Sequence, residues 1–268
     1  AFLSQLGLES VLVDNDPTMG DASHDILDDV FYHNLLSRVR AGEFFAIFAA
    51  PPCSTFSISR FFRVKDGPPI VRSRNHILGL PGLPREHRRE LLGSNALVAR
   101  LCTLLGEGAA AGSQFVIENP VDRGDRSRPR EYLNADHGSL WQMPDVVDLA
   151  KRCHSSTVHF PMCEFGASWQ KATTLMYTSG LEPWMAPLRS LTCTHANHKS
   201  MAGGTRDENG KWISQEAAAY PPAFNFYLAR SFAGLHSPSL APAAPTPPVV
   251  IPDAQVASLN VDPTKGAS

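Results

Sequence analysis

The sequence lacks the features that mark several specialised classes of protein. Its 268 residues contain no apolar run close to the ~18 residues that a membrane span needs. Residues 1–7 have neither the basic start nor the cleavage site of a signal peptide. The five cysteines are an odd number without the spacing of a disulfide scaffold, which favours free thiols. These absences predict an intracellular protein of the nucleus or cytoplasm, with no membrane contact and no obligate protein partner.

The charge of the chain is nearly balanced, so it does not by itself indicate a nucleic-acid-binding protein. The formal net charge at pH 7 is −2. Basic side chains nevertheless gather over residues 60–89, where only Asp66 and Glu86 oppose them. Such a stretch suits the phosphate backbone of DNA, and it suits a solvated loop equally well. Within it, Arg72 and Arg74 are our candidates for phosphate contacts.

Apolar runs and amphipathic stretches alternate in the first half of the chain. The runs at 10–14, 44–50 and 114–117 predict buried strands. The spacing of leucines and valines over 90–107 predicts an amphipathic helix, and 31–39 predicts a shorter one. This alternation is typical of an α/β fold with a parallel sheet.

The second half of the chain is less regular. We expect a short helix over 145–152, a pair of antiparallel strands at 157–160 and 173–177, and a last helix within 216–232. After residue 236, Pro, Ala and Ser dominate, which predicts a disordered tail or linker.

Three polar clusters follow predicted strands, at the edge where open α/β sheets bind their ligands. They are Asp14-Asn15-Asp16, Pro51-Pro52-Cys53 and Glu118-Asn119-Pro120. The Cys53 thiolate can add to an electron-poor ring carbon, while the Glu118 carboxyl can protonate or hydrogen-bond a ring nitrogen. An acid after the first strand suits the hydroxyls of an adenosine ribose. A buried structural cysteine and ordinary turn acids are the competing explanations.

Two of these clusters resemble motifs of the C5-cytosine DNA methyltransferases, and in particular the phage- and transposon-associated members. Residues 51–57, Pro-Pro-Cys-Ser-Thr-Phe-Ser, look like the nucleophile motif Pro-Pro-Cys-Gln-x-Phe-Ser. Residues 115–120, Phe-Val-Ile-Glu-Asn-Pro, look like the Glu-Asn-Val/Pro motif. Further matches follow in the order of the family: Asp14 and Asp16, His24-Asp25-Ile26, Cys163-Glu164-Phe165-Gly166 with Lys171-Ala172-Thr173, and Tyr220-Pro221-Pro222-Ala223-Phe224. The resemblance covers about residues 3 to 230.

The resemblance implies a Rossmann-like methyltransferase core that binds S-adenosylmethionine as cofactor and DNA as partner. It implies that Cys53 adds to C6 of a flipped cytosine and that Glu118 stabilises the N3-protonated ring, so that C5 accepts the methyl group. The expected cofactor-binding residues are Asp14, Asp16, Asp25, Ile26 and Pro51. The expected substrate-binding residues are Asn119, Arg72, Arg74, Lys171 and Thr173.

On this interpretation the chain has three parts. Residues 1–178 form the catalytic core, 179–235 form a small C-terminal lobe with a short target-recognition region and a return helix, and 236–268 form the tail. The family's glycine-rich Phe-x-Gly-x-Gly motif is absent, so we expect the first strand to lie upstream of Ala1 and these residues alone to bind cofactor weakly. Ser54 also replaces the usual Gln. A non-catalytic nucleic-acid-binding remnant of a mobile-element polyprotein, or an RNA cytosine methyltransferase, stays open as an alternative.

A cluster of cysteines and histidines near the C-terminal end offers soft ligands of the kind that zinc prefers. Cys193, His195 and His198 lie close in sequence, and Cys163 or Cys153 can complete a set of four. The Cys-x-His-x-x-His spacing differs from that of standard zinc fingers. The sequence therefore assigns no metal and favours polar loop residues or phosphate contacts, with zinc as the open alternative.

Overall fold

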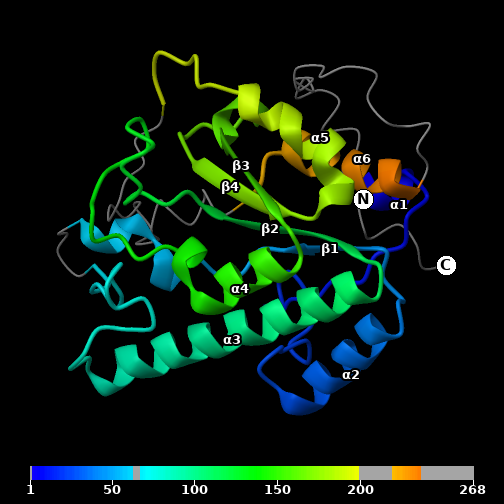
Figure 1. Cartoon of the computed structure of the whole chain (residues 1–268), viewed down its shortest axis with the longest axis horizontal. Helices are drawn as coiled ribbons and strands as arrows, with labels where there is room; N and C mark the ends of the chain where they lie inside the picture. The colour runs from blue at the N-terminus through cyan, green and yellow to red at the C-terminus, as the bar shows by residue number, and fades with distance from the viewer. Residues whose placement is uncertain (1, 63–66, 199–218, 237–268) are drawn as a thin grey trace.

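The computed structural model describes residues 2–62, 67–198 and 219–236 (Figure 1). The α-helices of this part are α1 (Phe2–Gln5), α2 (Asp29–Arg40), α3 (Arg85–Ala110), α4 (Pro144–Arg152), α5 (Glu182–Met185) and α6 (Pro222–His236). The strands are β1 (Ala46–Ala49), β2 (Gln114–Pro120), β3 (Ser156–Pro161) and β4 (Ala172–Tyr177). Short 3₁₀ helices lie between them: η1 (Ser54–Phe56), η2 (Ile58–Phe61), η3 (Leu140–Gln142), η4 (Met162–Phe165), η5 (Ser179–Leu181) and η6 (Ala186–Ser190).

The four strands form one mixed sheet in the order β1-β2-β4-β3. β1 runs parallel to β2, whereas β4 runs antiparallel to both β2 and β3. Three strands therefore point the same way and β4 alone is reversed. The expected mixture of helices and strands in an α/β fold is confirmed, and so is the antiparallel pairing of β3 with β4, whereas the sheet is mixed and not purely parallel.

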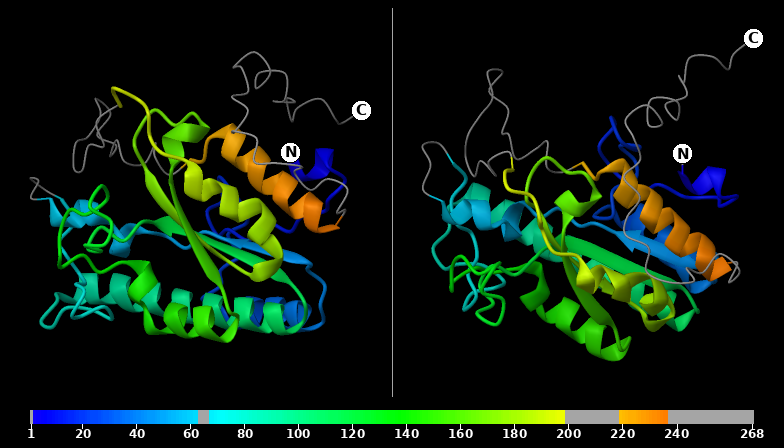
Figure 2. Two further views of the ribbon diagram at one scale, coloured as in Figure 1. Left: turned by 45° about the horizontal axis from the view of Figure 1, so that its top comes forward. Right: turned by 90° about the horizontal axis from the view of Figure 1, so that it is seen from above.

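Helices cover both faces of the sheet (Figures 1 and 2). α3 and α4 lie on one face, with α2 packed against α3, and α5 and α6 lie on the other. Alternate residues of β2 pack against the helices on opposite faces of the sheet, because successive side chains of a strand point to opposite faces. Phe115 and Ile117 pack with α3 and α4, whereas Val116 packs with α5 and α6. Glu118 shares the parity of Val116 and so faces the α6 side.

The helices form where the spacing of apolar residues predicts them. α2 begins after Asp28, whose carboxylate accepts a hydrogen bond from Phe31 N at 2.8 Å, as N-cap residues do. Its buried residues recur at helical spacing: Tyr32, Leu36 and Val39. α3 buries a long stripe against the sheet and ends before Gly112, whose φ of 97° suits glycine.

The strand predicted over residues 10–14 is wrong, because this segment is irregular in the structure. Its apolar side chains are exposed, with Val11 at 49% and Leu12 at 60% of their full accessible surface. β1 is the edge strand on its side of the sheet, and residues 10–14 do not pair with its free side.

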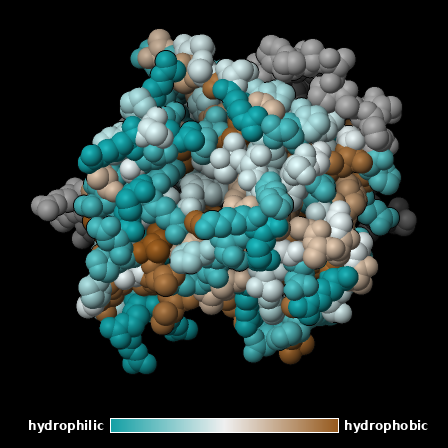
Figure 3. Space-filling view, in the orientation of Figure 1, coloured by the Kyte–Doolittle hydropathy of each residue, from teal (hydrophilic) through white to brown (hydrophobic). Residues whose placement is uncertain are grey.

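The described segments after β4 pack on the sheet. Leu181, Trp184 and Leu188 share one core cluster with Val116 of β2 and Phe224 of α6. Residues 199–218 of the expected C-terminal lobe and residues 237–268 of the expected tail lie outside the described residues. No described helix combines the length and the apolar character that a membrane crossing requires. The face drawn in Figure 3 is mainly hydrophilic, with apolar groups in small separate areas.

Candidate active site

The direction of the strands brings several polar residues to one edge of the sheet. β1, β2 and β3 end at this edge, and β4 begins there. Cys53 therefore follows the end of β1, Glu118 lies near the end of β2, and Lys171 directly precedes β4. The carboxyl edge predicted from the sequence thus carries the expected thiol, carboxyl and ammonium groups.

Cys53 sits at a sharp turn between β1 and η1. Pro51 and Pro52 end the strand, since proline cannot donate to a strand ladder. Cys53 has φ −83° and ψ 1°, and its carbonyl accepts a hydrogen bond from Phe56 N at 2.9 Å. Thr55 and Phe56 are buried and anchor the turn in the core. The turn therefore leaves Cys53 partly exposed while the residues after it are fixed.

Burial and two neighbouring charges set the protonation of the Cys53 thiol. Burial raises the pKa of this thiol, the ammonium group of Lys171 acts to lower it, and the charge of Glu118 raises it further. The net pKa lies above the ordinary value, so the resting thiol is protonated at neutral pH. Lys171 is the neighbouring charge that favours the nucleophilic thiolate.

Glu118 is 4% exposed, and its two carboxyl oxygens differ in their surroundings. Oε2 accepts a hydrogen bond from the Tyr220 hydroxyl at 2.5 Å. Oε1 is buried without a hydrogen-bond partner and lies 3.5 Å from Lys171 Nζ. A buried acceptor of this kind is costly unless a ligand satisfies it. Glu118 Oε1 therefore has the Lys171 ammonium group as its neighbour and accepts no hydrogen bond from a described residue.

Tyr220 completes the cluster, although the sequence did not mark it as a site residue. Its ring lies 5.1 Å from Lys171 Nζ and contacts Phe48 of β1. Burial and the negative charge of Glu118 raise the pKa of its hydroxyl, so it stays a hydrogen-bond donor. The only sequence signal was its place in the segment Tyr220-Pro221-Pro222 that opens α6.

Asn119 and Thr173 have structural roles. Asn119 is 2% exposed and donates from Nδ2 to the Pro51 carbonyl at 3.0 Å, so it ties the end of β2 to the turn before Cys53. Thr173 is fully buried in β4 opposite Pro120. This burial leaves Thr173 no surface for the expected substrate contact, whereas the neighbouring Lys171 reaches the site.

The expected cofactor acids lie in turns that use their own carboxylates. Asp14 Oδ1 accepts from Asp16 N at 2.9 Å, Asp16 Oδ1 accepts from Thr18 N at 2.9 Å, and Asp25 Oδ1 accepts from Leu27 N at 2.8 Å. These are the self-bonded turns that Asp commonly forms. Each carboxylate keeps a second oxygen, so the expectation of a ribose contact stays a prediction.

A cleft of about 490 Å³ lies between the turn after Ile26 and the turn at Cys53. Leu27, Pro52 and Ser54 line one side of it, and Glu90 and Leu97 of α3 line another. Ligand sites usually have roughly 300–1,000 Å³, so this cleft can hold a group of nucleoside size. Leu27, Pro52 and Ser54 directly follow Ile26, Pro51 and Cys53 in the sequence, whereas the latter three do not line the cleft themselves.

The prediction that Arg72 contacts phosphate is wrong, because its side chain is 1% exposed. Its guanidinium stacks 3.9 Å from the ring centre of Phe56. It also donates to Thr55 O at 3.2 Å, to Ile77 O at 2.7 Å and to Asn95 Oδ1 at 3.2 Å. Burial, together with the charge of Arg60, lowers the pKa of Arg72 to about 10. Arg72 therefore has a structural role, because its buried side chain supports the loop after Cys53.

Arg74 keeps a surface position but is not a free cation. It pairs with Asp122 at 2.7 Å and donates to the Ala135 carbonyl at 3.2 Å. Burial acts to raise the pKa of Asp122, yet hydrogen bonds from His137, Gly124 and Arg74 outweigh it and lower this pKa to about 2. Arg74 thus joins the loop after Cys53 to the loop after β2, and a phosphate contact stays a prediction.

Comparisons with known proteins give no support for or against any family. No protein-family model matches the sequence, and searches of curated proteins and of solved structures find no significant match. The functional argument therefore depends on the residues of the site and on the resemblance of their motifs.

Proposed function

We propose that this chain is the catalytic core of a DNA cytosine-C5 methyltransferase with a Rossmann-like fold that uses S-adenosylmethionine. One observation carries the proposal: Cys53, Glu118, Lys171 and Tyr220 form a single cluster at the carboxyl edge of the sheet, in which Glu118 Oε1 pairs with Lys171 and accepts no hydrogen bond. The family motifs that resemble residues 51–57 and 115–120 pair a thiol and a carboxyl in the same way. A cysteine that is merely structural does not need a buried carboxyl and an ammonium group beside it.

In the proposed reaction, Cys53 acts as a nucleophile toward the target cytosine. The Cys53 thiol releases its proton to solvent, Lys171 stabilises the resulting thiolate, and the thiolate forms a bond between Sγ and ring C6. The electron pair of the C5–C6 double bond shifts toward C5, and Glu118 stabilises the ring in its N3-protonated form through Oε1. Tyr220 holds Oε2, so the carboxyl keeps one orientation during this step.

S-adenosylmethionine, when bound, would supply the methyl group that C5 accepts and would leave as S-adenosylhomocysteine. The cleft beside Leu27, Pro52 and Glu90 fits a nucleoside in size and borders the turn that carries Cys53. After methylation, a base such as water would remove the C5 proton, the C5–C6 double bond would return and Cys53 would leave as the thiolate. The thiolate then takes a proton from solvent, and the DNA carries 5-methylcytosine.

Base chemistry of this kind requires the cytosine to leave the helical stack, because the ring carbon is otherwise out of reach. The partner is therefore proposed to be DNA whose target base is flipped toward Cys53. Duplex DNA and structured RNA compete directly in a binding assay, which separates the DNA proposal from the RNA alternative.

A mechanism-based trap tests the proposed function. A duplex with 5-fluorocytosine, incubated with the protein and S-adenosylmethionine, should form a covalent adduct, because fluorine at C5 cannot leave as a proton does. Cys53→Ala should abolish the adduct. Cys153→Ala, which alters a half-buried thiol elsewhere, should preserve it. An adduct that survives Cys53→Ala would overturn the assignment of the nucleophile.

A further inference from the structure

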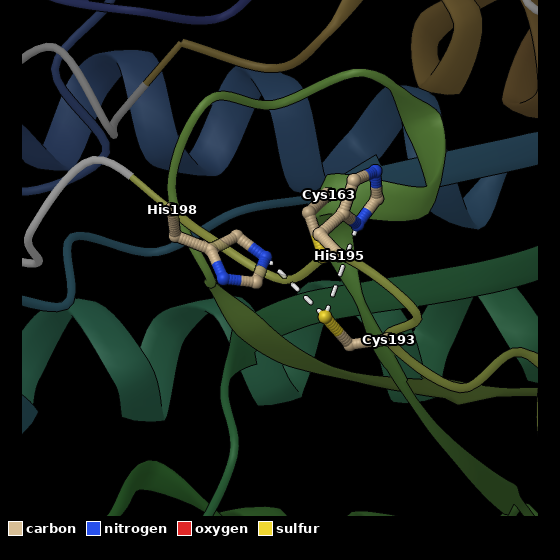
Figure 4. Close-up of side chains that lie close together, drawn as sticks. All are labelled: Cys163, Cys193, His195 and His198. Atoms are coloured by element: carbon tan, nitrogen blue, oxygen red, sulfur yellow. Dashed lines mark hydrogen bonds between the residues drawn. The ribbon is translucent and has the colours of Figure 1, made fainter.

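A second cluster of chemically active side chains lies apart from Glu118 and Cys53. Cys163, Cys193, His195 and His198 each present one donor atom, and these atoms lie within 4.8 Å of one another. Figure 4 shows the two imidazole rings and the Cys193 thiol turned toward a common centre beside Cys163. Two thiols and two imidazoles that converge in this way are the donor set of tetrahedral zinc sites.

The measured separations suit a single ion. Cys193 Sγ lies 3.3 Å from His198 Nε2 and 3.8 Å from His195 Nδ1. Zinc binds sulfur at about 2.3 Å and nitrogen at about 2.0–2.1 Å, so tetrahedral geometry separates a sulfur and a nitrogen by about 3.6 Å. The two sulfur–nitrogen distances lie on either side of that value.

The four residues come from two segments that are distant in sequence. Cys163 belongs to η4, directly after β3, and is 2% exposed. The other three ligands lie after η6, in residues 193–198. Glu164 strengthens the link between the segments, because its Oε1 accepts from Thr194 N at 3.4 Å and lies 3.4 Å from His195 Nδ1.

We propose that Cys163, Cys193, His195 and His198 bind one structural Zn²⁺ ion. Each cysteine releases its thiol proton to solvent and binds as thiolate, so two negative charges balance the charge of the ion. A donor set of two sulfurs and two nitrogens selects zinc over magnesium or calcium, which prefer oxygen. With all four positions filled by protein, the ion has no open site for catalysis.

The proposed ion would stabilise the turn that carries Lys171. η4 begins this turn, and Met162 N donates to the Lys171 carbonyl at 2.8 Å, which closes it. Gly166, with φ 92°, ends η4 and donates to the Cys163 carbonyl at 2.9 Å. A cross-link from Cys163 to residues 193–198 therefore restrains the segment that holds Lys171 beside Glu118. The ion's role is structural and does not depend on methyl transfer.

Metal content of the purified full chain tests the proposal without any activity assay. Protein expressed with zinc and freed of loose metal by gel filtration should hold about one zinc ion per chain, measured by plasma mass spectrometry. Cys193→Ser and His198→Asn should each lose most of it. The matched controls Cys153→Ser and His33→Asn, which change residues outside the cluster, should retain the wild-type content.

Cobalt substitution provides a readout in the unaltered chain, so the test does not depend on whether variants fold. Co²⁺ in the proposed site should give the intense visible bands of four-coordinate cobalt and a thiolate charge-transfer band in the near ultraviolet, and Zn²⁺ should displace it. A wild-type chain without bound zinc, a six-coordinate cobalt spectrum, or a disulfide between Cys163 and Cys193 in metal-loaded protein would each overturn the proposal. Undiminished zinc in Cys193→Ser would do so as well.

Discussion

Tyr220 donates its hydroxyl proton to Glu118 Oε2 at 2.5 Å, although 102 positions separate the two residues. The hydrogen bond joins the start of α6 to the end of β2. It fixes the carboxyl group so that Oε1 faces Lys171 and the region of Cys53. The orientation of the proposed catalytic acid therefore depends on how the last helix docks on the sheet.

Removal of the Tyr220 hydroxyl should slow catalysis. Tyr220→Phe keeps the ring contacts but leaves Glu118 Oε2 without its donor, which costs about 1–3 kcal/mol in a buried site. We expect methyl transfer to slow by about 10- to 100-fold, measured with labelled cofactor on a cytosine duplex. Tyr227→Phe is the control, because that hydroxyl bonds the Trp184 carbonyl instead. Equal rates in the two variants would argue against a role for Tyr220 in orienting Glu118.

Loss of the Lys171 charge should make Cys53 less reactive. The ammonium group lowers the pKa of the thiol, so Lys171→Met should raise that pKa and shift the alkylation profile of Cys53 to higher pH. Peptide mapping after iodoacetamide treatment measures the rate of Cys53 alkylation, which should fall several-fold at pH 8 in Lys171→Met. Lys171→Arg retains the charge and should stay near the wild-type profile. An unshifted profile in Lys171→Met would remove Lys171 from the site.

Replacement of Arg72 should destabilise the fold strongly. Arg72→Met leaves the Thr55 and Ile77 carbonyls without their donor, and we expect the free energy of unfolding to fall by about 3–5 kcal/mol. Urea denaturation measures the change. Arg74→Met removes a surface ion pair and should cost at most about 1 kcal/mol. A small decrease in the free energy of unfolding of Arg72→Met would contradict this structural role of Arg72.

The lowered pKa of His159 should make the free energy of unfolding depend on pH. Burial, with the charge of Arg128, lowers the pKa of His159 to about 4, against about 6.5 in the unfolded chain. Between these values the unfolded chain binds more protons, so stability falls as the pH drops. From pH 7 to pH 5 the expected loss is about 1–2 kcal/mol, by urea denaturation at each pH. His159→Gln should flatten this part of the curve, whereas His33→Gln should not.

If Arg74 contacts DNA, its neutralisation should weaken binding without regard to sequence. Arg74→Gln should reduce the slope of log affinity against log salt by about one unit on both specific and random duplexes. Fluorescence anisotropy over a range of salt concentrations measures the slope. An unchanged slope would leave Arg74 with only its structural link to Asp122.

The parts of the fold that depend on local pattern could be predicted from the sequence. The apolar run at 114–117 lies in β2, and the stripe over 90–107 lies in α3. In both segments the spacing of apolar residues by itself defines the face that is buried in the core. The run at 10–14 has an equally good pattern, yet Leu12 is 60% exposed. An apolar run predicts burial but does not show whether a second strand will pair with it, and residues 10–14 pair with no strand of the sheet.

The candidate site divides in the same way. Cys53 and Glu118 were recognisable because short motifs surround them and follow strands. Tyr220 was not selected, since its contact with Glu118 arises only when α6 docks. Arg72 was misjudged because an arginine in a basic stretch ordinarily lies at the surface, whereas this one replaces water with carbonyl groups.

Within the described part of the chain, the edge strand β1 has one side on which its backbone forms no strand pairing. β1 pairs only with β2 there, and no backbone hydrogen bond from a described residue reaches its other side. Exposed ladders of this kind recruit further strands by augmentation. The unpaired backbone N–H and C=O groups of Ala46–Ala49 therefore mark the side of the sheet at which a further strand would add.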